Sequence, residues 1–156
     1  MSSGDDLRAL MGRFPAGVAV ATIDLDGERL GLTLGSLVSL SLEPPLVGIS
    51  VSRDAALHEL LRRAGEFSVS LLSEGQEALA QHFARGVPPV ALWSGVAVRA
   101  EAGAPLLEGA LGWLRCEIWA EYDAGDHTFF VGEVLSAQSG PRAAPLVYVE
   151  QSYQAL

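Results

Sequence analysis

The sequence predicts a mainly β protein, an antiparallel barrel of about six or seven strands whose ends are covered by a few helices. Side chains alternate between two faces through residues 111–122, which indicates a long half-buried strand. Hairpin turn signals stand at Asp26-Gly27 and in residues 123–126. Because the helical segments do not alternate regularly with the strands, a parallel sheet of β-α-β units is not indicated.

One domain over residues 1–156 accounts for the length of the chain. The chain has 156 residues, 49% of them hydrophobic, and a domain of this size buries about 68–70% of its surface on folding. No repeat, low-complexity stretch or break in composition marks a second domain. We therefore expect a single core that needs neither a disulfide nor a metal.

The first predicted element is a helix. Apolar residues at helical spacing are Leu7, Leu10, Met11 and Phe14. Ser3 or Asp5 is available as the N-terminal cap, and Pro15 ends the helix. We expect the apolar stripe of this helix to lie on another surface.

Strands follow this helix. Residues 17–24 are small and β-branched, residues 29–34 return from the first turn, and residues 36–42 alternate between polar and apolar. Pro44-Pro45 then breaks the pattern before residues 46–51, an apolar run typical of a buried strand. These patterns predict one hairpin through Asp26-Gly27 and two further strands separated by a rigid Pro-Pro corner.

Two short helices interrupt the strands. The first is centred on residues 57–61, and residues 67–72 form another strand. Residues 78–83 predict the second helix, with Ser73 as its cap and Gln76 at the spacing of a capping box. Both helices are too irregularly placed to be crossover connections.

The last strands complete the sheet. Residues 96–99 can form a short strand, residues 128–136 return from the second turn, and residues 146–149 can close the sheet. In residues 111–122, one face is predicted to carry Leu114, Cys116, Ile118, Ala120 and Tyr122. Trp113 and Trp119 fall on the other face together with charged residues.

Composition excludes several classes of partner. Ten basic residues against 19 acidic ones give a formal net charge of −9, and the basic residues are scattered, so we expect no nucleic acid partner. No apolar run approaches the roughly 18 residues of a membrane helix, so we expect no membrane partner. The acidic start lacks the order of a signal peptide, and Cys116 is the single cysteine, so we expect a cytoplasmic protein.

Metal and hydrolase chemistry find no support in the sequence. His58, His82 and His127 lie far apart, without a cysteine pair, an HExxH motif or an acidic ligand loop, so we expect no metal. No Gly-x-Ser-x-Gly elbow is present. Cys116 lies among apolar neighbours in a predicted strand, where a thiol usually acts as a small hydrophobic group.

Residues 31–47 hold the densest group of polar side chains and glycines. The members are Gly31, Thr33, Gly35, Ser36, Ser39 and Ser41. Hydroxyls and backbone N–H groups at an irregular link between strands can hold a flat polar ring and its phosphate. The same residues can also form the polar face of a strand in solvent, and composition does not separate the two interpretations.

Four motifs, in the same chain order, resemble those of the flavin reductase-like family. This family comprises FMN-binding split barrels that serve as short-chain NAD(P)H:flavin oxidoreductases. The matching segments are residues 14–22 (Phe-x-x-Gly-Val-x-Val-x-Thr), residues 31–47 (Gly-x-Thr-x-x-Ser-x-x-Ser-x-Ser-Leu-x-Pro-Pro-Leu-Val), residues 67–83 (Phe-x-Val, then Gln, Leu and Phe) and residues 125–134 (Gly-Asp-His-x-x-x-x-Gly-x-Val). The resemblance implies an antiparallel Greek-key split β-barrel, FMN or FAD as cofactor, and NADH or NADPH as co-substrate.

The resemblance also implies the residues of the site. The flavin ring lies against residues 33–37, where fixed N–H dipoles stabilise the negative charge of the reduced ring. Ser39, Ser41, Ser52 and Arg53 lie toward the phosphate. The complete expected cofactor-binding set is Thr33, Leu34, Gly35, Ser36, Leu37, Ser39, Ser41, Ser52, Arg53, His82 and Phe83.

The sequence leaves two interpretations open for His127 and two for His82. The resemblance places His127 at the nicotinamide side of the flavin, where it positions the nicotinamide, but a turn histidine bonded to its own loop fits the sequence as well. His82 can contact the phosphate or serve packing, and packing alone explains Phe83. A departure from the family is Asp54, which repels a phosphate unless Arg53 neutralises it.

The implied activity is the reduction of FMN or FAD by NAD(P)H, with delivery of the reduced flavin to a partner monooxygenase. A flavin-binding protein or electron carrier without reductase activity, an enzyme that uses its flavin directly on an organic substrate, and a barrel without ligand remain open. The resemblance further implies a homodimer, for which Trp113 and Trp119 could supply an apolar contact face.

Overall fold

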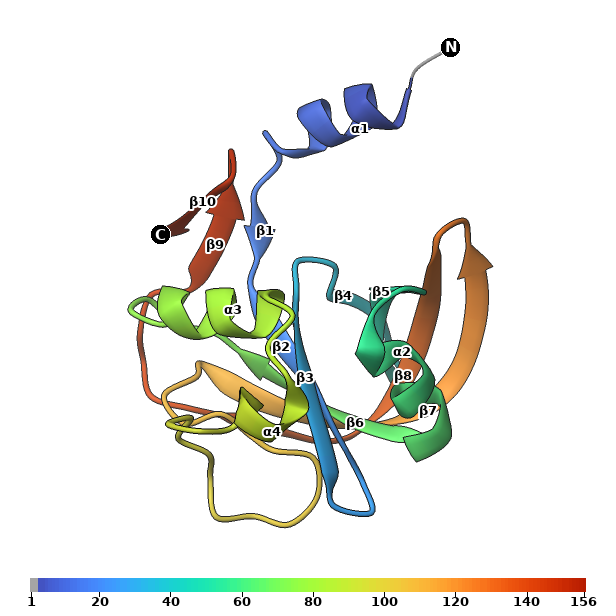
Figure 1. Ribbon diagram of the computed structural model, residues 1–156, viewed down its shortest axis with the longest axis vertical. Helices are drawn as coiled ribbons and strands as arrows, with labels where there is room; N and C mark the ends of the chain where they lie inside the picture. Colours follow the sequence, from blue (N-terminus) through green and yellow to red (C-terminus); the bar gives the residue numbers. More distant parts are fainter. Residues whose placement is uncertain (1–2) are drawn as a thin grey trace.

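Two antiparallel sheets form the body of the protein in the computed structural model, which describes residues 3–156. The larger sheet has seven strands in the order β3-β2-β6-β7-β8-β5-β4, and the smaller has three in the order β1-β9-β10 (Figure 1). The strands are β1 (Ala16–Gly17), β2 (Ala19–Leu25), β3 (Glu28–Leu34), β4 (Val38–Leu42), β5 (Pro45–Ser52), β6 (Glu66–Leu71), β7 (Gly112–Ala124), β8 (His127–Ser139), β9 (Leu146–Val149) and β10 (Ser152–Ala155). The mainly β, antiparallel prediction is therefore confirmed.

The larger sheet is open between β3 and β4. These consecutive strands are its two edges, and residues 35–37 span the gap between them. An open edge of this kind fits the split barrel implied by the sequence resemblance. The β10 strand, which pairs with β9, was not anticipated from the sequence because its four residues carry no clear alternation.

The long strand β7 departs from regular alternation. A bulge at residues 118–120 gives β7 one extra residue opposite β8, and a bulge moves every later side chain to the other face. The expectation that Ala120 and Tyr122 share a face with Cys116 is therefore wrong, and the Tyr122 side chain is exposed.

Trp113 differs from its predicted exposure. It is buried, because the loop of residues 99–111 covers its face of the sheet. Its indole Nε1 donates a hydrogen bond to the carbonyl of Leu107 at 2.7 Å, and the Arg99 guanidinium lies 4.0 Å from the ring centroid. Such packing by a remote loop leaves no local signal in the strand itself.

Three helices cover the larger sheet: α2 (Ala56–Ala64), α3 (Glu77–Ala84) and the short α4 (Pro89–Leu92). The cap of α3 is Gln76 and not Ser73; the Gln76 side chain accepts hydrogen bonds from the backbone and hydroxyl of Ser73 before the helix begins. The α4 helix was not predicted, since four residues give no periodicity. The predicted strand at residues 96–99 is reduced to a single bridge between Val98 and Leu107.

The N-terminal helix α1 (Gly4–Met11) forms as predicted, with Ser3 as its cap and Asp6 completing a capping box. The described chain does not cover the apolar stripe of this helix, because α1 stands clear of both sheets in Figure 1 and none of its residues is buried. The exposed side chains are Leu7, Leu10, Met11 and Phe14, at 51–69%. Residues 12–15 lead the helix away while β1 pairs with β9, so the helix does not fold back.

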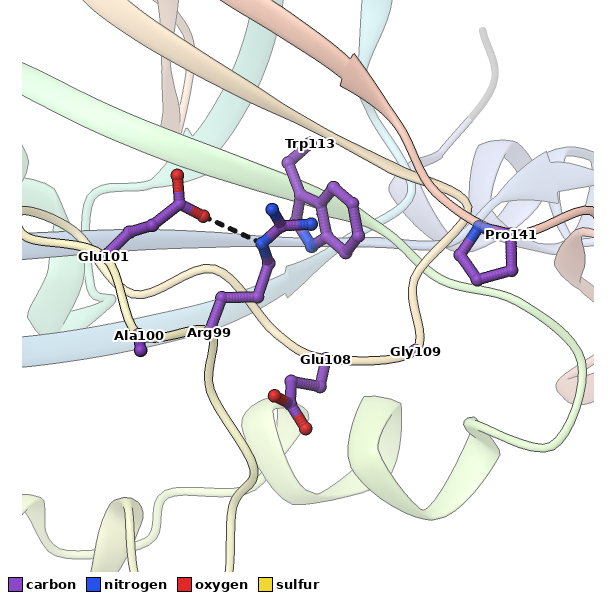
Figure 2. Close-up of a pocket in the computed structure, with 7 residues that line it drawn as sticks. All are labelled: Arg99, Ala100, Glu101, Glu108, Gly109, Trp113 and Pro141. Carbon is purple, nitrogen blue, oxygen red and sulfur yellow. Dashed lines mark hydrogen bonds and ion pairs between the residues drawn. The ribbon is translucent and has the colours of Figure 1, made fainter.

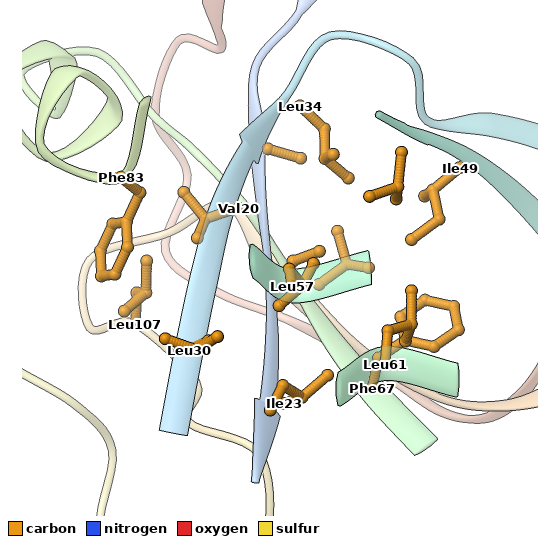
Figure 3. Close-up of a cluster of buried hydrophobic side chains, with 14 of the residues drawn as sticks. Val20, Ile23, Leu30, Leu34, Ile49, Leu57, Leu61, Phe67, Phe83 and Leu107 are labelled. Atoms are coloured by element: carbon orange, nitrogen blue, oxygen red, sulfur yellow. The ribbon is translucent and has the colours of Figure 1, made fainter. Parts of the chain in front are cut away.

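A single main core lies between the larger sheet and helices α2 and α3 (Figure 3). Its side chains include Val20, Ile23, Leu30, Leu34, Ile49, Leu57, Leu61, Phe67, Phe83 and Leu107. Core residues from β5 occupy alternate positions, so the intervening residues of β5 face the opposite side of the sheet. No helix within residues 3–156 is long and apolar enough to cross a membrane.

Candidate functional site

The side of β5 that faces away from the core is small and polar. Gly48, Ser50 and Ser52 alternate with core residues, and Phe129 and His127 of β8 pair directly with Ser50 and Ser52. Paired residues of antiparallel strands project from the same face. These five residues therefore form one surface, which we call the hairpin face.

The link between β3 and β4 is held against the hairpin face. The Ser36 hydroxyl accepts a hydrogen bond from the Ser50 N–H at 3.0 Å and donates one to the Ser50 carbonyl at 3.2 Å. Within the described chain, the backbone N–H groups of residues 35–37 have no protein acceptor. These N–H groups are therefore hydrogen-bond donors without intramolecular partners, and they lie beside the hairpin face.

A cavity of about 390 Å³ lies between β3, the start of α2 and the end of α3. It is lined by residues 30–32 of β3, by residues 54–57 at the start of α2, and by the chain from Phe83 to Leu92. Residues 53–55 connect Ser52, at the end of β5 on the hairpin face, to the start of α2, which lines the cavity. The two features are therefore parts of one contiguous region.

The cavity has the elements of an anion site. The N-cap of α2 is Ala55, which offers no side-chain cap; the His58 N–H is bonded to the Ala55 carbonyl, and the N–H groups of Ala56 and Leu57 remain available. Arg85 lines the opposite wall and forms no ion pair in the structure of residues 3–156. Asp54 is the one carboxylate in the lining and opposes an anion.

Thr33 and Ser36 were predicted to hold the flavin ring, but their hydroxyls form hydrogen bonds within the protein. The Thr33 hydroxyl donates to the carbonyl of Ala80 in α3, and the Ser36 hydroxyl is occupied by Ser50. The backbone of Gly35 and Leu37 remains available for a ligand, whereas the Leu34 side chain is buried in the core. Within residues 33–37 the ligand donors are thus backbone amides.

The predicted anion-binding residues are not brought together. Ser41 pairs with Leu46, six residues from Ser52 along β5, and a strand advances about 3.3 Å per residue, so about 20 Å separates Ser41 from Ser52. Ser39, opposite Val47, lies about 17 Å from Ser52 on the same measure. One phosphate therefore cannot contact both groups.

Arg53 lies at the junction between the hairpin face and the cavity. Its Nη2 pairs with Asp123 Oδ1 at 2.7 Å, and its backbone N–H donates to the carbonyl of Asp126 at 3.1 Å. Because the guanidinium is held by Asp123 in the β7–β8 hairpin, it does not neutralise Asp54. The sequence predicted Arg53 as an anion contact and left open whether it neutralises Asp54.

His127 is half-exposed at the tip of the hairpin. Its Nδ1 lies 2.7 Å from Asp126 Oδ1, and this hydrogen bond holds the pKa of Asp126 below its usual value. The carboxylate of Asp126 therefore orients the ring, as the turn interpretation anticipated. The structure also leaves Nε2 without a partner in residues 3–156, so this nitrogen is free to meet a ligand.

His82 and Phe83 occupy different environments. His82 Nε2 donates to the carbonyl of Leu92 at 2.6 Å, which ties the end of α4 to α3, and His82 does not line the cavity. Phe83 is buried, and its ring lies over Gly31 at the cavity wall. A Cβ at Gly31 would lie 2.7 Å from the ring, so only glycine fits there.

Sequence reasoning missed four residues of this region: Ser50, Phe129, Gly48 and Arg85. Gly48 and Ser50 carried a signal, since small and polar residues at every second position of residues 48–52 predict one face outside the core, whereas Phe129 lies outside that run. Arg85 carried none, because its relation to the start of α2 depends on how α3 packs against the sheet.

A larger hollow, of about 520 Å³, lies elsewhere. Figure 2 shows Arg99 stacked on Trp113 and bonded through Nε to Glu101 at 2.8 Å, with Glu108 on the far side. Trp113 is near the start of β7 and His127 follows the end of that strand, so this hollow lies at the opposite end of the hairpin. It contains none of the predicted site residues.

No cluster of three metal-ligating side chains gathers within the part of the chain that the structure describes. Cys116 is buried, and burial raises the pKa of its thiol to about 12. A thiol protonated at neutral pH is a poor nucleophile. The chemistry of the region therefore rests on amides, His127 and Arg85.

The fold is that of a split-barrel protein whose open edge carries backbone N–H donors without protein acceptors in residues 3–156. The chain belongs to the flavin reductase-like family, whose flavin reductase like domain matches residues 11–156. A reductase component of 4-hydroxyphenylacetate 3-monooxygenase from Thermus thermophilus is 44% identical over 146 residues, which cover 94% of this chain and 92% of that protein. An NADH-dependent FAD reductase from Streptomyces globisporus is 40% identical over 149 residues, covering 91% of this chain and 80% of the relative.

Solved structures agree with this membership. The NADH:FAD oxidoreductase of Streptomyces globisporus C-1027 superposes with a TM-score of 0.91 at 38% identity, covering 100% of this chain and 96% of the other. The same oxidoreductase in complex with NAD and FAD fragments gives a TM-score of 0.90, covering 99% of this chain and 94% of the other. The likeness therefore extends over the whole fold.

Proposed function

We propose that this chain is an NAD(P)H-dependent flavin reductase that reduces FMN or FAD by hydride transfer and supplies reduced flavin to a partner monooxygenase. The observation that carries the proposal is the similarity of sequence and fold, over nearly the full length, to proteins named as flavin reductases and as reductase components of monooxygenases. The amide donors at the split and the adjoining cavity support it.

The residues of the region fit a bound flavin. The unpartnered N–H groups of residues 35–37 suit the polar edge of the ring, and the hairpin face supplies a flat wall of small side chains beside them. When bound, the flavin supplies a two-electron acceptor for the reduced nicotinamide. The amides stabilise negative charge at the ring edge and cost no reorganisation, because Ser36 fixes their loop on Ser50.

The cavity suits the phosphate end of the flavin. The open N-terminus of α2 and Arg85 replace Ser39 and Ser41 as the expected anion contacts. Asp54 weakens this contact through repulsion, since its carboxylate lines the same cavity. Moderate affinity for the phosphate suits a flavin that is released after reduction.

His127 positions the nicotinamide. Asp126 holds Nδ1, so the free Nε2 is directed by an orienting carboxylate, and Ser52 lies directly across the strand pair. Hydride transfer needs no side-chain acid or base, so His127 contributes through binding and orientation. His127→Ala is expected to raise the KM for the nicotinamide more than the KM for the flavin.

The protein is proposed to be a homodimer. Trp119, Tyr122 and Leu135 on β7 and β8 are exposed apolar side chains, as is the stripe of α1, and a partner subunit would cover them. Trp113 takes no part, because its own chain buries it. A monomeric mass in solution at micromolar concentration would contradict the dimer.

The single cysteine and the absence of a membrane-spanning helix in residues 3–156 support a cytoplasmic location.

The test is the oxidation of NADH and NADPH by the purified protein with and without added FMN and FAD. We expect oxidation that depends on flavin. A protein that binds flavin, seen by quenching of flavin or tryptophan fluorescence, but leaves both nucleotides unoxidised would instead be a binder or electron carrier. Unchanged fluorescence at saturating FMN and FAD would remove both functions.

A further inference from the structure

We propose that His58, through a hydrogen bond with Thr128, is a positioning residue that sets the place of His127 and links it to the flavin cavity. The inference rests on the proposed function of His127. It concerns a buried histidine on α2 that has no part in the site described above. The side chain of His58 makes three contacts, and these join helix α2 to strand β8.

His58 is enclosed between α2 and the inner face of β8. Its ring is 4% exposed, its Nε2 lies 2.7 Å from Thr128 Oγ1, and its Nδ1 lies 3.2 Å from Glu59 Oε1. The ring also meets the edge of Phe130 with centroids 5.5 Å apart. A buried polar ring with both nitrogens occupied has one orientation, because turning it over would leave a buried nitrogen without a partner.

The direction of each hydrogen bond follows from the partners. A carboxylate only accepts, so Nδ1 carries the proton that is donated to Glu59. In the neutral ring Nε2 is then the acceptor, and the Thr128 hydroxyl donates to it. Thr128 is itself 1% exposed, so its hydroxyl needs this acceptor inside the protein.

The hydrogen bond between His58 and Thr128 joins the two parts of the candidate site, the hairpin face and the cavity. Thr128 directly follows His127, and in a strand the two side chains project to opposite faces, so fixing Thr128 on the inside fixes the direction of His127 on the outside. His58 belongs to the first turn of α2, whose residues 55–57 line the cavity. A shift of α2 against the sheet is therefore passed to the residue next to His127.

The main test is Thr128→Val, which keeps the shape of the side chain and removes the hydroxyl. We expect the KM for NADH to rise about three- to tenfold, the size of one lost hydrogen bond, with kcat and the KM for flavin nearly unchanged. Thr128→Ser, which restores the hydroxyl, recovers the wild-type KM. His58→Leu removes the acceptor from the other side and gives the same split if Thr128→Val does not fold.

The matched control is Thr22→Val. Thr22 is also fully buried and donates a 2.7 Å hydrogen bond, but to the carbonyl of Pro105, far from the β7–β8 hairpin. Both variants lose a similar amount of thermal stability, and only Thr128→Val changes the KM for NADH. An equal rise in KM in the two variants would show that general destabilisation causes it, and would overturn the inference.

The double variant separates positioning from other effects. If Thr128 acts through His127, adding Thr128→Val to His127→Ala raises the KM for NADH no further. A full additional rise in that background overturns the inference. If wild-type protein oxidises NADH with added flavin but His127→Ala leaves every KM unchanged, the reductase function stands and this inference fails.

Discussion

Gly48 lies where an added methyl group would strike Phe129. A Cβ on Gly48 would fall 2.2 Å from Phe129 Cζ and 2.8 Å from Cε1, whereas carbon atoms in ordinary contact are about 3.5–4.0 Å apart. Gly48→Ala therefore forces the tip of the ring to move by about 1.3 Å or more. Since Phe129 pairs with Ser50 on the hairpin face, the displacement occurs inside the candidate site.

Overpacking of this kind costs about 1–3 kcal/mol. For a chain of 156 residues each kcal/mol lowers Tm by about 2–4 °C, so Tm should fall by roughly 2–12 °C. We expect the KM for NADH to rise as well, because the ring is displaced beside His127. Thermal unfolding followed by circular dichroism, together with steady-state kinetics, measures both effects.

Two further variants identify the cause. Gly17→Ala is the matched control, since a Cβ on this strand glycine meets no atom within 4 Å, and it should leave Tm nearly unchanged. Phe129→Leu removes the end of the ring, so Gly48→Ala should cost much less in that background. An unchanged Tm for Gly48→Ala, or an equal loss in both backgrounds, would refute the steric argument.

Three other predictions test individual side chains. Because burial raises the pKa of the Cys116 thiol from 9.0 to about 12, its contribution to stability is complete below about pH 9 and is lost as the pH rises toward 12. Between pH 7 and 10.5, denaturant unfolding should show a loss about 2 kcal/mol larger for wild type than for Cys116→Ala, and parallel curves would contradict this. Arg85→Gln should weaken FMN binding far more than riboflavin binding, while Ser39→Ala changes neither; the reverse result in fluorescence titrations would return the phosphate to β4. Thr33→Val, which removes the hydrogen bond to Ala80, should lower Tm by about 2–4 °C with FMN affinity unchanged, and weaker FMN binding at an unchanged Tm would show that the hydroxyl serves the flavin.

Much of the fold was predictable from local patterns. The turn at Asp26-Gly27 joins β2 and β3 as predicted, and Gly125-Asp126 joins β7 and β8. Glycine and aspartate turns carry their signal within a few residues, and alternation carries the strand signal within a few more. Four family motifs in order were enough to predict the family, which the comparisons confirm.

The partners of the polar side chains were not predictable. The Arg53 guanidinium bonds to Asp123, seventy positions away, and the Thr33 hydroxyl bonds to α3 instead of facing outward. Both partners are decided by the order of strands in the sheet and by helix packing. The sequence around a hydroxyl does not show whether it will form a hydrogen bond with the protein or with a ligand.

By itself, then, the sequence determined most of the strands, the two hairpin turns, the capped helix α1 and the family, because each depends on residues near one another in the chain. The tertiary structure alone decided that α1 stands free, that a bulge in β7 reverses the face of Tyr122, and that Arg85 and the start of α2 share a cavity. Those outcomes depend on how distant segments pack and on which polar groups form hydrogen bonds with one another. Packing and hydrogen-bond satisfaction are properties of the assembled chain.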